Sequence, residues 1–186
     1  MKPEQFIKQI LTDVKVKLTD EFDQNFERKA FFDKKWPATT LHNRKGSILS
    51  RTGALRRSIQ SNTAGSQITF KSSVPYAQIQ NEGGKIQVTK KMKKFFWAMH
   101  YKSSNAITYR ISNKKVNNTI RNRKLTEEAN MWKAMALKPE GSFITIKQRQ
   151  FIGHHPKVDR LIRSIIHQNI QELSNTIHKN HGNTNT

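Results

Sequence analysis

The sequence predicts an α+β fold in which a long N-terminal helix and a C-terminal amphipathic helix cover a small antiparallel sheet. Three observations lead to this prediction. Apolar residues recur at steps of three and four over residues 4–32, and they do so again over residues 156–178, which is the period of an amphipathic helix. Between these segments, short stretches that alternate apolar and polar residues are bounded by Gly and Pro, as is typical of strands and turns.

The N-terminal helix is predicted from one continuous apolar stripe. Pro3 suits the first helical turn, and a rise of ~1.5 Å per residue gives the helix a length of roughly 40 Å. We expect the helix to end before Pro37, after a bulky cluster of Phe31, Phe32 and Trp36. The stripe consists of Phe6, Ile7, Ile10, Leu11, Val14, Leu18, Phe22, Phe26 and Ala30.

Shorter elements are expected after a polar connector over residues 38–50. Thr52 suits the N-cap of a short helix, and Ile68 and Phe70 lie on one face of an alternating segment. The expected elements are, in order, a short helix over 53–59, a turn over 62–66, a strand over 67–74, a helical turn over 76–81 and the start of a strand at 86–88.

The middle of the chain is predicted to form two helices before a last strand over 142–146. Met92, Phe95, Phe96 and Met99 have helical spacing, and they favour a helix over residues 90–101. Residues 102–124 are rich in Ser, Asn and Lys, and they fit either a short strand or a mobile arm. The next helix is expected to be capped at Thr126 and to end at Pro139.

The chain is expected to form one domain. It contains no internal repeat and no Pro- or Gly-rich linker that would divide it. We therefore expect a single α+β domain over residues 1–178, with residues 87–141 inserted between two strands of the sheet. Residues 179–186 are polar, and they are expected to form a disordered tail.

Positive charge is unevenly distributed. The chain has 34 Lys and Arg against 13 Asp and Glu, a net charge of +21, yet residues 1–35 are nearly balanced, with 8 basic and 7 acidic residues. Residues 85–124 contain 12 basic residues and no acidic residue. Such a block attracts either a nucleic-acid backbone or an acidic protein surface, and charge alone does not distinguish the two. The candidate basic surface consists of Arg56, Arg57, Lys90, Lys91, Lys93, Lys94, Arg121, Arg123 and Lys124.

Aromatic residues alternate with lysines around residues 93–102. Phe95, Phe96, Trp97 and Tyr101 could form a platform on which the bases of a single-stranded nucleic acid stack. They could equally form the buried face of an amphipathic helix whose lysines are solvated. The shared face of Met92, Phe95, Phe96 and Met99 favours the buried face.

Several classes of function are disfavoured by what the sequence lacks. Without cysteine it can hold no disulfide and no Cys-ligated metal, and it has no Gly-rich phosphate loop or nucleophile elbow. The adjacent His154 and His155 fit a surface turn before Pro156 better than a metal site, and the carboxylates are too scattered for a metal-dependent nuclease. We expect no catalytic residue, no cofactor and no metal. No apolar run has the length of a membrane span and no secretory signal is present, so a cytoplasmic, reducing environment is expected.

Three local patterns occur in a characteristic order. They are RTGALRRSI at residues 51–59, VPYAQIQNEGGKI at residues 74–86 and QRQFIG at residues 148–153, the last followed by the C-terminal helix. Together they resemble the phage virion morphogenesis family, which includes tail completion proteins of Mu-like and P2-like phages. Gln80 stands where the family usually has His, Gln148 where it usually has Pro, and residues 87–141 are longer than the family pattern. The matching residues are Gly53, Leu55, Ser58, Tyr76, Ala77, Asn81, Gly83, Gly84, Arg149, Phe151 and Gly153.

The resemblance implies a structural protein of the phage neck or tail, without enzymatic activity. It implies a homo-oligomeric ring, expected to be a hexamer, at the head-proximal end of the tail, where it completes the tail and supports head–tail joining. The expected partners are tail tube, tail terminator, head-closure or portal proteins, with DNA in the lumen and no membrane. The expected location is the virion, and the host cytoplasm during assembly. Terminator, completion and head-closure roles stay open, and a basic nucleic-acid-binding protein is the alternative.

Overall fold

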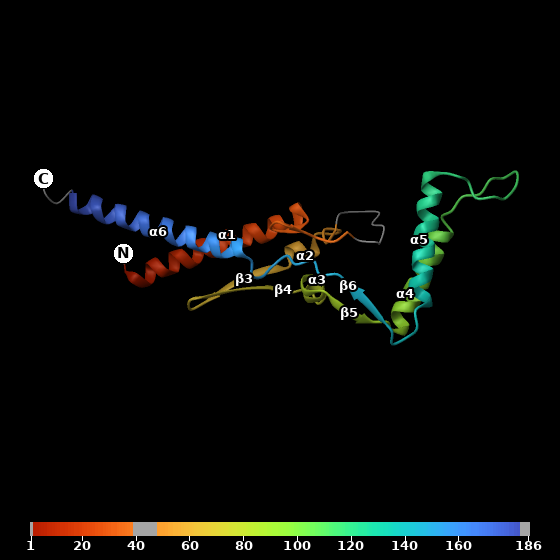
Figure 1. Ribbon diagram of the computed structural model, residues 1–186, viewed down its shortest axis with the longest axis horizontal. Helices are drawn as coiled ribbons and strands as arrows, with labels where there is room; N and C mark the ends of the chain where they lie inside the picture. The colour runs from red at the N-terminus through yellow and green to blue at the C-terminus, as the bar shows by residue number, and fades with distance from the viewer. Residues whose placement is uncertain (1, 39–47, 183–186) are drawn as a thin grey trace. The chain divides into compact units, whose positions relative to one another are not determined.

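The computed structural model describes residues 2–38 and 48–182, and it confirms the α+β class, with small antiparallel two-stranded sheets and long helices (Figure 1). Where the sequence predicts one domain, these residues group into two compact units. The first unit contains the described parts of Met1–Pro37, Gly46–Glu82 and Gln148–Thr186, and the second contains Gly83–Lys147 and the described residue Ala38. The chain thus leaves the first unit at Gly83, within the second of the three patterns, and returns to it at Gln148, where the third begins.

The first unit is built on two long helices, α1 (Pro3–Arg28) and α6 (Pro156–Gly182), which lie side by side (Figure 1). Their apolar stripes face each other and pack on the aromatic residues that follow α1, because this arrangement removes both stripes from water. The buried residues of this core are Val14, Leu18, Phe22, Phe31, Phe32 and Val158.

The prediction that the apolar stripe over residues 4–32 forms one helix, ending only before Pro37, is wrong at its C-terminal end. The helix ends at Arg28, because Lys29 adopts a left-handed conformation with φ 53° and its N–H bonds to the carbonyl of Asn25. The chain then turns back in a small hairpin of β1 (Ala30–Phe31) and β2 (Lys34–Lys35). This reversal places Phe31 and Phe32 against Phe22 of the same helix, with ring centroids 6.4 and 6.3 Å away.

A second hairpin packs on α1. The expected turn over residues 62–66 is wrong in part, because β3 (Ile59–Ala64) pairs with β4 (Gln67–Ser72) as far as Ala64. Phe70 lies edge-on to Phe22 at 4.9 Å, as its place on the apolar face of the predicted strand requires. The short helices α2 (Ala54–Arg57) and α3 (Ala77–Glu82) lie before and after this hairpin in the chain.

The second unit is a helical hairpin joined to a two-stranded sheet. Strands β5 (Gly84–Gln87) and β6 (Phe143–Ile146) pair antiparallel. The helices α4 (Lys90–Ser104) and α5 (Ile120–Leu137) follow β5 and pack along each other. Thr89 caps α4 by accepting the N–H of Met92 at 3.2 Å. Residues with little exposure form the core of this unit: Val88, Phe96, Leu125, Ala129 and Ala136.

Residues 102–124 form no regular strand, and the helix that follows them begins before Thr126. Helix α4 continues to Ser104, α5 begins at Ile120 with Thr119 as its cap, and the loop between them has one isolated bridge, Tyr109 to Val116. The buried amide of Asn122 donates to the carbonyls of Thr108 and Asn117, both at 2.8 Å. Asn122 therefore fixes the loop to α5, which composition alone does not reveal.

The C-terminal helix is longer than predicted. Helix α6 extends to Gly182, so residues 179–182 are helical and not part of a disordered tail. These residues include no Pro, and no Gly before Gly182, so nothing in their sequence interrupts the backbone hydrogen bonds of the helix. The remainder of the expected tail, residues 183–186, lies outside the described residues.

Candidate partner-binding surfaces

The three family-like patterns meet in the first unit. Leu55, Ala77 and Phe151 come one from each pattern, and all three are buried in one cluster with Phe26 and Trp36. The Phe151 side chain has 0% exposure, and its ring lies 5.3 Å from that of Phe26. We name these five residues the motif centre. Their convergence explains why the three patterns need apolar residues at these positions.

Asn81 links the second pattern to the third. Its Oδ1 accepts the backbone N–H of Phe151 at 2.9 Å and that of Ile152 at 3.1 Å. The backbone N–H of Arg149 donates to the carbonyl of Gln80 at 2.8 Å. Two polar backbone groups of the third pattern thus find their acceptor in one side chain, which stabilises the buried position of Phe151.

Asn25 is a structural residue that the sequence reasoning missed. Its side chain is fully buried, donates to the carbonyl of Phe151 at 3.1 Å and accepts the N–H of Phe32 at 2.9 Å. The second bond holds Phe32 at φ 56°, which is unfavourable for a bulky residue. The available signal was a polar side chain three residues after Phe22, on the apolar side of the stripe.

The other pattern residues have varied roles. Gly53 and Gly153 have φ angles of 70° and 130°, which favour glycine. A Cβ at Gly53 would also lie 2.7 Å from the Arg57 side chain. Ser58 is buried, and its hydroxyl donates to the carbonyl of Leu55 at 2.7 Å. Tyr76 is 45% exposed, so it lies outside the motif centre. Gly83, with φ 75°, connects α3 to β5, and Gly84, with φ 145°, is the first residue of β5.

Arg149 lies beside the motif centre. Its Nε donates to the carbonyl of Pro37 at 3.1 Å, and burial lowers the pKa of its guanidinium group. The side chain therefore ties the segment before Phe151 to the end of the first hairpin.

Two arginines of the candidate basic surface lie in this unit, and they differ. Arg56 bonds to both carboxylate oxygens of Asp23 and forms an ion pair with Glu27 at 2.8 Å. The hydrogen bonds that this guanidinium donates to Asp23 and Glu27 raise its pKa further above the ordinary value. Arg57 is exposed, and its Nη2 donates to the carbonyl of Thr52 at 2.9 Å. Arg56 thus joins α2 to α1, and Arg57 faces solvent.

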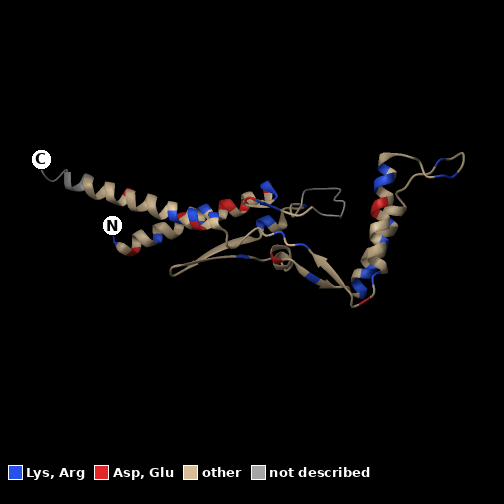
Figure 2. Cartoon of the chain, in the orientation of Figure 1, with Lys and Arg blue, Asp and Glu red and all other residues tan. Residues whose placement is uncertain are grey.

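The other candidate cations lie in the second unit. Gly83–Lys147 contains 15 Lys and Arg but 3 Asp and Glu, so at least 12 positive charges remain if every carboxylate neutralises one. Figure 2 shows these cations along α4, α5 and their loop. Lys93 donates to the carbonyl of Lys138 at 2.9 Å and so caps the end of α5. The remaining six are exposed: Lys90, Lys91, Lys94, Arg121, Arg123 and Lys124.

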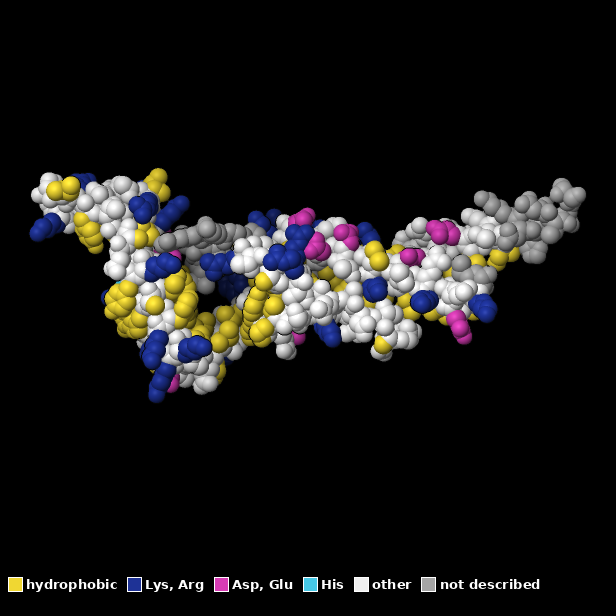
Figure 3. Space-filling view, turned by 180° about the vertical axis from the view of Figure 1, so that it is seen from behind, with side chains coloured by type: hydrophobic (Ala, Val, Ile, Leu, Met, Phe, Trp, Pro, Cys, Tyr) yellow, Lys and Arg dark blue, Asp and Glu magenta, His cyan; other side chains and the backbone are white. Residues whose placement is uncertain are grey.

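The aromatic residues of α4 divide between core and surface. Phe96 is 7% exposed and stacks on Trp132 of α5, as predicted for the buried face. The expectation that Phe95 shares that face is wrong, because Phe95 is 54% exposed. Tyr101 is 56% exposed, and its ring stacks on Trp97 at 5.9 Å. Hydrophobic and basic side chains therefore share the surface of the hairpin (Figure 3).

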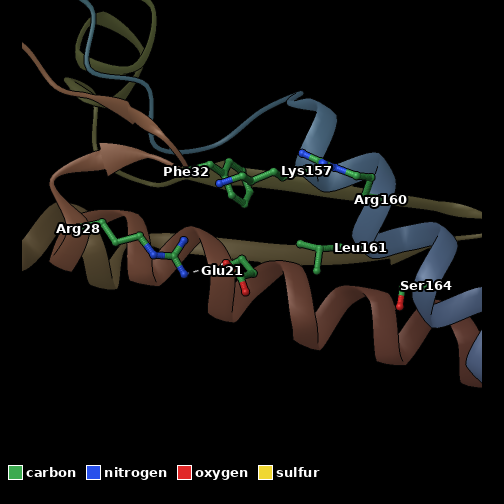
Figure 4. A pocket seen from close by; sticks show the side chains of 7 residues that line it. All are labelled: Glu21, Arg28, Phe32, Lys157, Arg160, Leu161 and Ser164. Atoms are coloured by element: carbon green, nitrogen blue, oxygen red, sulfur yellow. Dashed lines mark hydrogen bonds and ion pairs between the residues drawn. The ribbon is translucent and has the colours of Figure 1, made fainter.

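A pocket of about 490 Å³ opens between α1 and α6 (Figure 4). Glu21 lies at its wall and pairs with Arg28 at 3.0 Å, while Lys157 and Arg160 come from α6. Burial by itself would raise the pKa of Glu21, but hydrogen bonds from Arg28 and Lys17 outweigh it and lower that pKa. The pocket thus presents positive charge around one paired carboxylate.

The histidine pair takes part in local packing. His155 stacks on Phe32 with ring centroids 4.8 Å apart, and its Nε2 lies 3.0 Å from Asp33. His154 lies 3.7 Å from Asp159. Across residues 2–38 and 48–182, no three His, Asp or Glu side chains are grouped as a metal site requires. In the same part of the chain, no helix combines the length and hydropathy of a membrane span.

Comparison of the chain with protein-family models, with curated proteins and with solved structures gives no match.

Proposed function

We propose that this chain is a non-enzymatic structural subunit of a bacteriophage neck or tail. In this proposal it forms a homo-oligomeric ring at the head-proximal end of the tail, completes the tail and supports head–tail joining. The observation that carries the proposal is the motif centre, because the three patterns that resemble the virion morphogenesis family converge on one buried cluster. Asn81 adds a direct link between two of those patterns.

Apolar surface on the long helices supports an assembly role. On α6, Ile166, Ile170 and Ile177 are 36%, 50% and 47% exposed, and their spacing places them on one side of the helix. On α1, Ile7 and Val16 are 53% and 62% exposed. Association with other subunits would remove this surface from water, and the hydrophobic effect would then stabilise the assembly.

Charge opposes the same assembly. Copies with a net charge of +21 repel each other, and salt screens that repulsion over a Debye length of about 10 Å at 0.1 M. Ring formation is therefore expected to increase with ionic strength, or to require an anionic partner.

The test is the mass of the purified full chain in solution, measured by light scattering at low and high salt, with negative-stain electron microscopy. We expect rings of one size, and Ile170→Glu should convert them to monomers because it places a charge on the apolar side of α6. The matched control is Asn175→Glu, an exposed position on another side of the same helix.

The proposal also predicts where the protein is found. Antibody labelling of phage particles should mark the junction between head and tail. A chain that stays monomeric at every salt concentration and is missing from particles would contradict the proposed function.

A further inference from the structure

We propose that the outer surface of α4 binds single-stranded nucleic acid, through aromatic stacking on the bases and lysine contacts to the phosphates. The residues concerned are Lys91, Lys94, Phe95, Trp97, Tyr101 and Lys102, which we name the α4 platform. This inference does not depend on the proposed assembly role, because it concerns the second unit alone.

Helical geometry separates the platform from the core of the hairpin. Phe96 and Ser103 are buried on the side of α4 that packs on α5. At about 100° per residue, Tyr101 lies on the side away from α5, whereas Phe95 and Trp97 lie on the two flanks. Phe95 and Tyr101 are more than half exposed and Trp97 is half-buried, so each ring can be reached in part without any opening of the hairpin.

Contacts within the hairpin hold the rings in place. Trp97 and Tyr101 stack with an interplanar angle of 26°. Phe95 is held edge-on by Trp132, with ring centroids 5.9 Å apart. A base that stacks on an already ordered ring loses less conformational entropy than one that must order it, so this arrangement favours binding.

Lysines surround these rings, and α4 itself carries no acidic residue. Lys91 and Lys94 lie within one helical turn of Phe95, and Lys102 follows Tyr101 directly. Residues 85–124 contain no carboxylate, so no acidic residue of α4 can pair with them. Lys90 and Lys91 also lie in the first turn, where the helix dipole disfavours cations. An anionic ligand would relieve this repulsion.

The aromatic residues favour nucleic acid over an acidic protein. The central part of a protein–protein interface is depleted in lysine, because each buried ammonium group must be desolvated. On α4 every exposed ring has a lysine within one turn, which is the combination that contacts bases and phosphates together. Single strands are favoured over duplexes because duplex bases are already stacked on each other.

The first experiment measures the binding of a fluorescent oligothymidylate of about 20 nucleotides to the full chain by anisotropy, over a range of salt concentrations. The affinity should fall steeply with salt, with a logarithmic slope of about −0.7 for each phosphate neutralised. The double variant Lys91→Ala, Lys94→Ala should reduce the slope by about 1.4. The matched control removes two exposed lysines of the first unit, Lys8→Ala and Lys71→Ala.

The second experiment tests stacking. Tyr101→Ala should weaken binding about tenfold, and Tyr101→Phe should restore it because the ring is kept. Tyr76→Ala, which removes an exposed ring of the first unit, should bind as the parent chain does. Bound bases should quench tryptophan fluorescence, and Trp97→Phe should remove most of that quenching.

Three results would overturn the inference. They are tighter binding of a duplex than of the single strand, equal binding of polyglutamate, and unchanged binding by Tyr101→Ala. Circular dichroism of each variant confirms that its helices are intact, so a loss of binding reports on the surface. The mass of the assembly, measured separately, keeps this result distinct from the test of the proposed ring.

Discussion

The two units use the same kinds of side chain in different ways. In the first unit, aromatic rings such as Phe151 and Phe26 are buried, and Arg56 is held by Asp23 and Glu27. In the second unit, Phe95 and Tyr101 are more than half exposed, and cations outnumber carboxylates by 15 to 3. Aromatic and basic residues thus stabilise the fold in one unit, while in the other many of them remain available to a partner.

The largest difference between the units is expected for aromatic truncation. Phe151→Ala should lower the free energy of unfolding by about 3–5 kcal/mol, because it leaves a cavity in the motif centre. Tyr101→Ala should change it by less than about 0.5 kcal/mol, since more than half of that side chain faces solvent. Urea unfolding followed by circular dichroism measures both. Equal losses for the two variants would remove the distinction between the units.

A second prediction tests whether the hydrogen bonds of Asn81 stabilise the motif centre. Asn81→Ala leaves the N–H groups of Phe151 and Ile152 without their acceptor, and it should cost about 2–3 kcal/mol of stability. Asn81→Asp keeps an oxygen at the same place and should recover most of the loss. The same unfolding measurement applies, and a similar loss for both variants would contradict the acceptor role.

A smaller difference in stability is expected between the loss of Arg56, which forms ion pairs, and the loss of Lys94, which is exposed to solvent. Arg56→Ala should cost about 1 kcal/mol, because two partly exposed ion pairs are lost together. Lys94→Ala, at an exposed site in the carboxylate-free segment, should leave stability unchanged or raise it slightly. Thermal unfolding of the two variants at low salt provides the comparison. If Lys94→Ala is the more damaging, the lysines of α4 have a structural role.

The smallest effect concerns pH. The folded-state pKa of Glu21 lies below its ordinary value of 4.5, so its charge stabilises the fold above that value, and the contribution disappears as the pH falls through the folded-state pKa. Between about pH 7 and pH 3, the free energy of unfolding should therefore fall by about 0.5 kcal/mol less for Glu21→Gln than for the parent chain. Unfolding midpoints across this range measure the difference. This difference should become smaller at high salt. If stability depends on pH in the same way in the two proteins, the ion pair of Glu21 with Arg28 contributes nothing.

Much of the fold could be predicted because periodicity is a local property. The stripes of α1 and α6, the spacing of α4 and the alternation in β4 each lie within one short segment. The errors occur where a distant contact decides. Helix α1 ends early because Phe31 and Phe32 return to its own apolar side, and the loop before α5 is fixed by the side chain of Asn122.

The candidate site was predictable in its residue types and not in its contacts. The three patterns were visible in the sequence, but Asn81 and Phe151 are 70 positions apart, and nothing local indicates their hydrogen bond. Asn25, which completes that arrangement, belongs to none of the patterns.

The sequence by itself determined the positions of the long helices and the segregation of positive charge, because both depend only on the order of residues along the chain. Tertiary structure alone decided that Phe96 is buried while Phe95 is exposed, and that Arg56 is paired while Lys94 faces solvent. The physical reason is that burial and charge pairing depend on which distant element packs against a face. Helical periodicity defines the face but does not specify its neighbour.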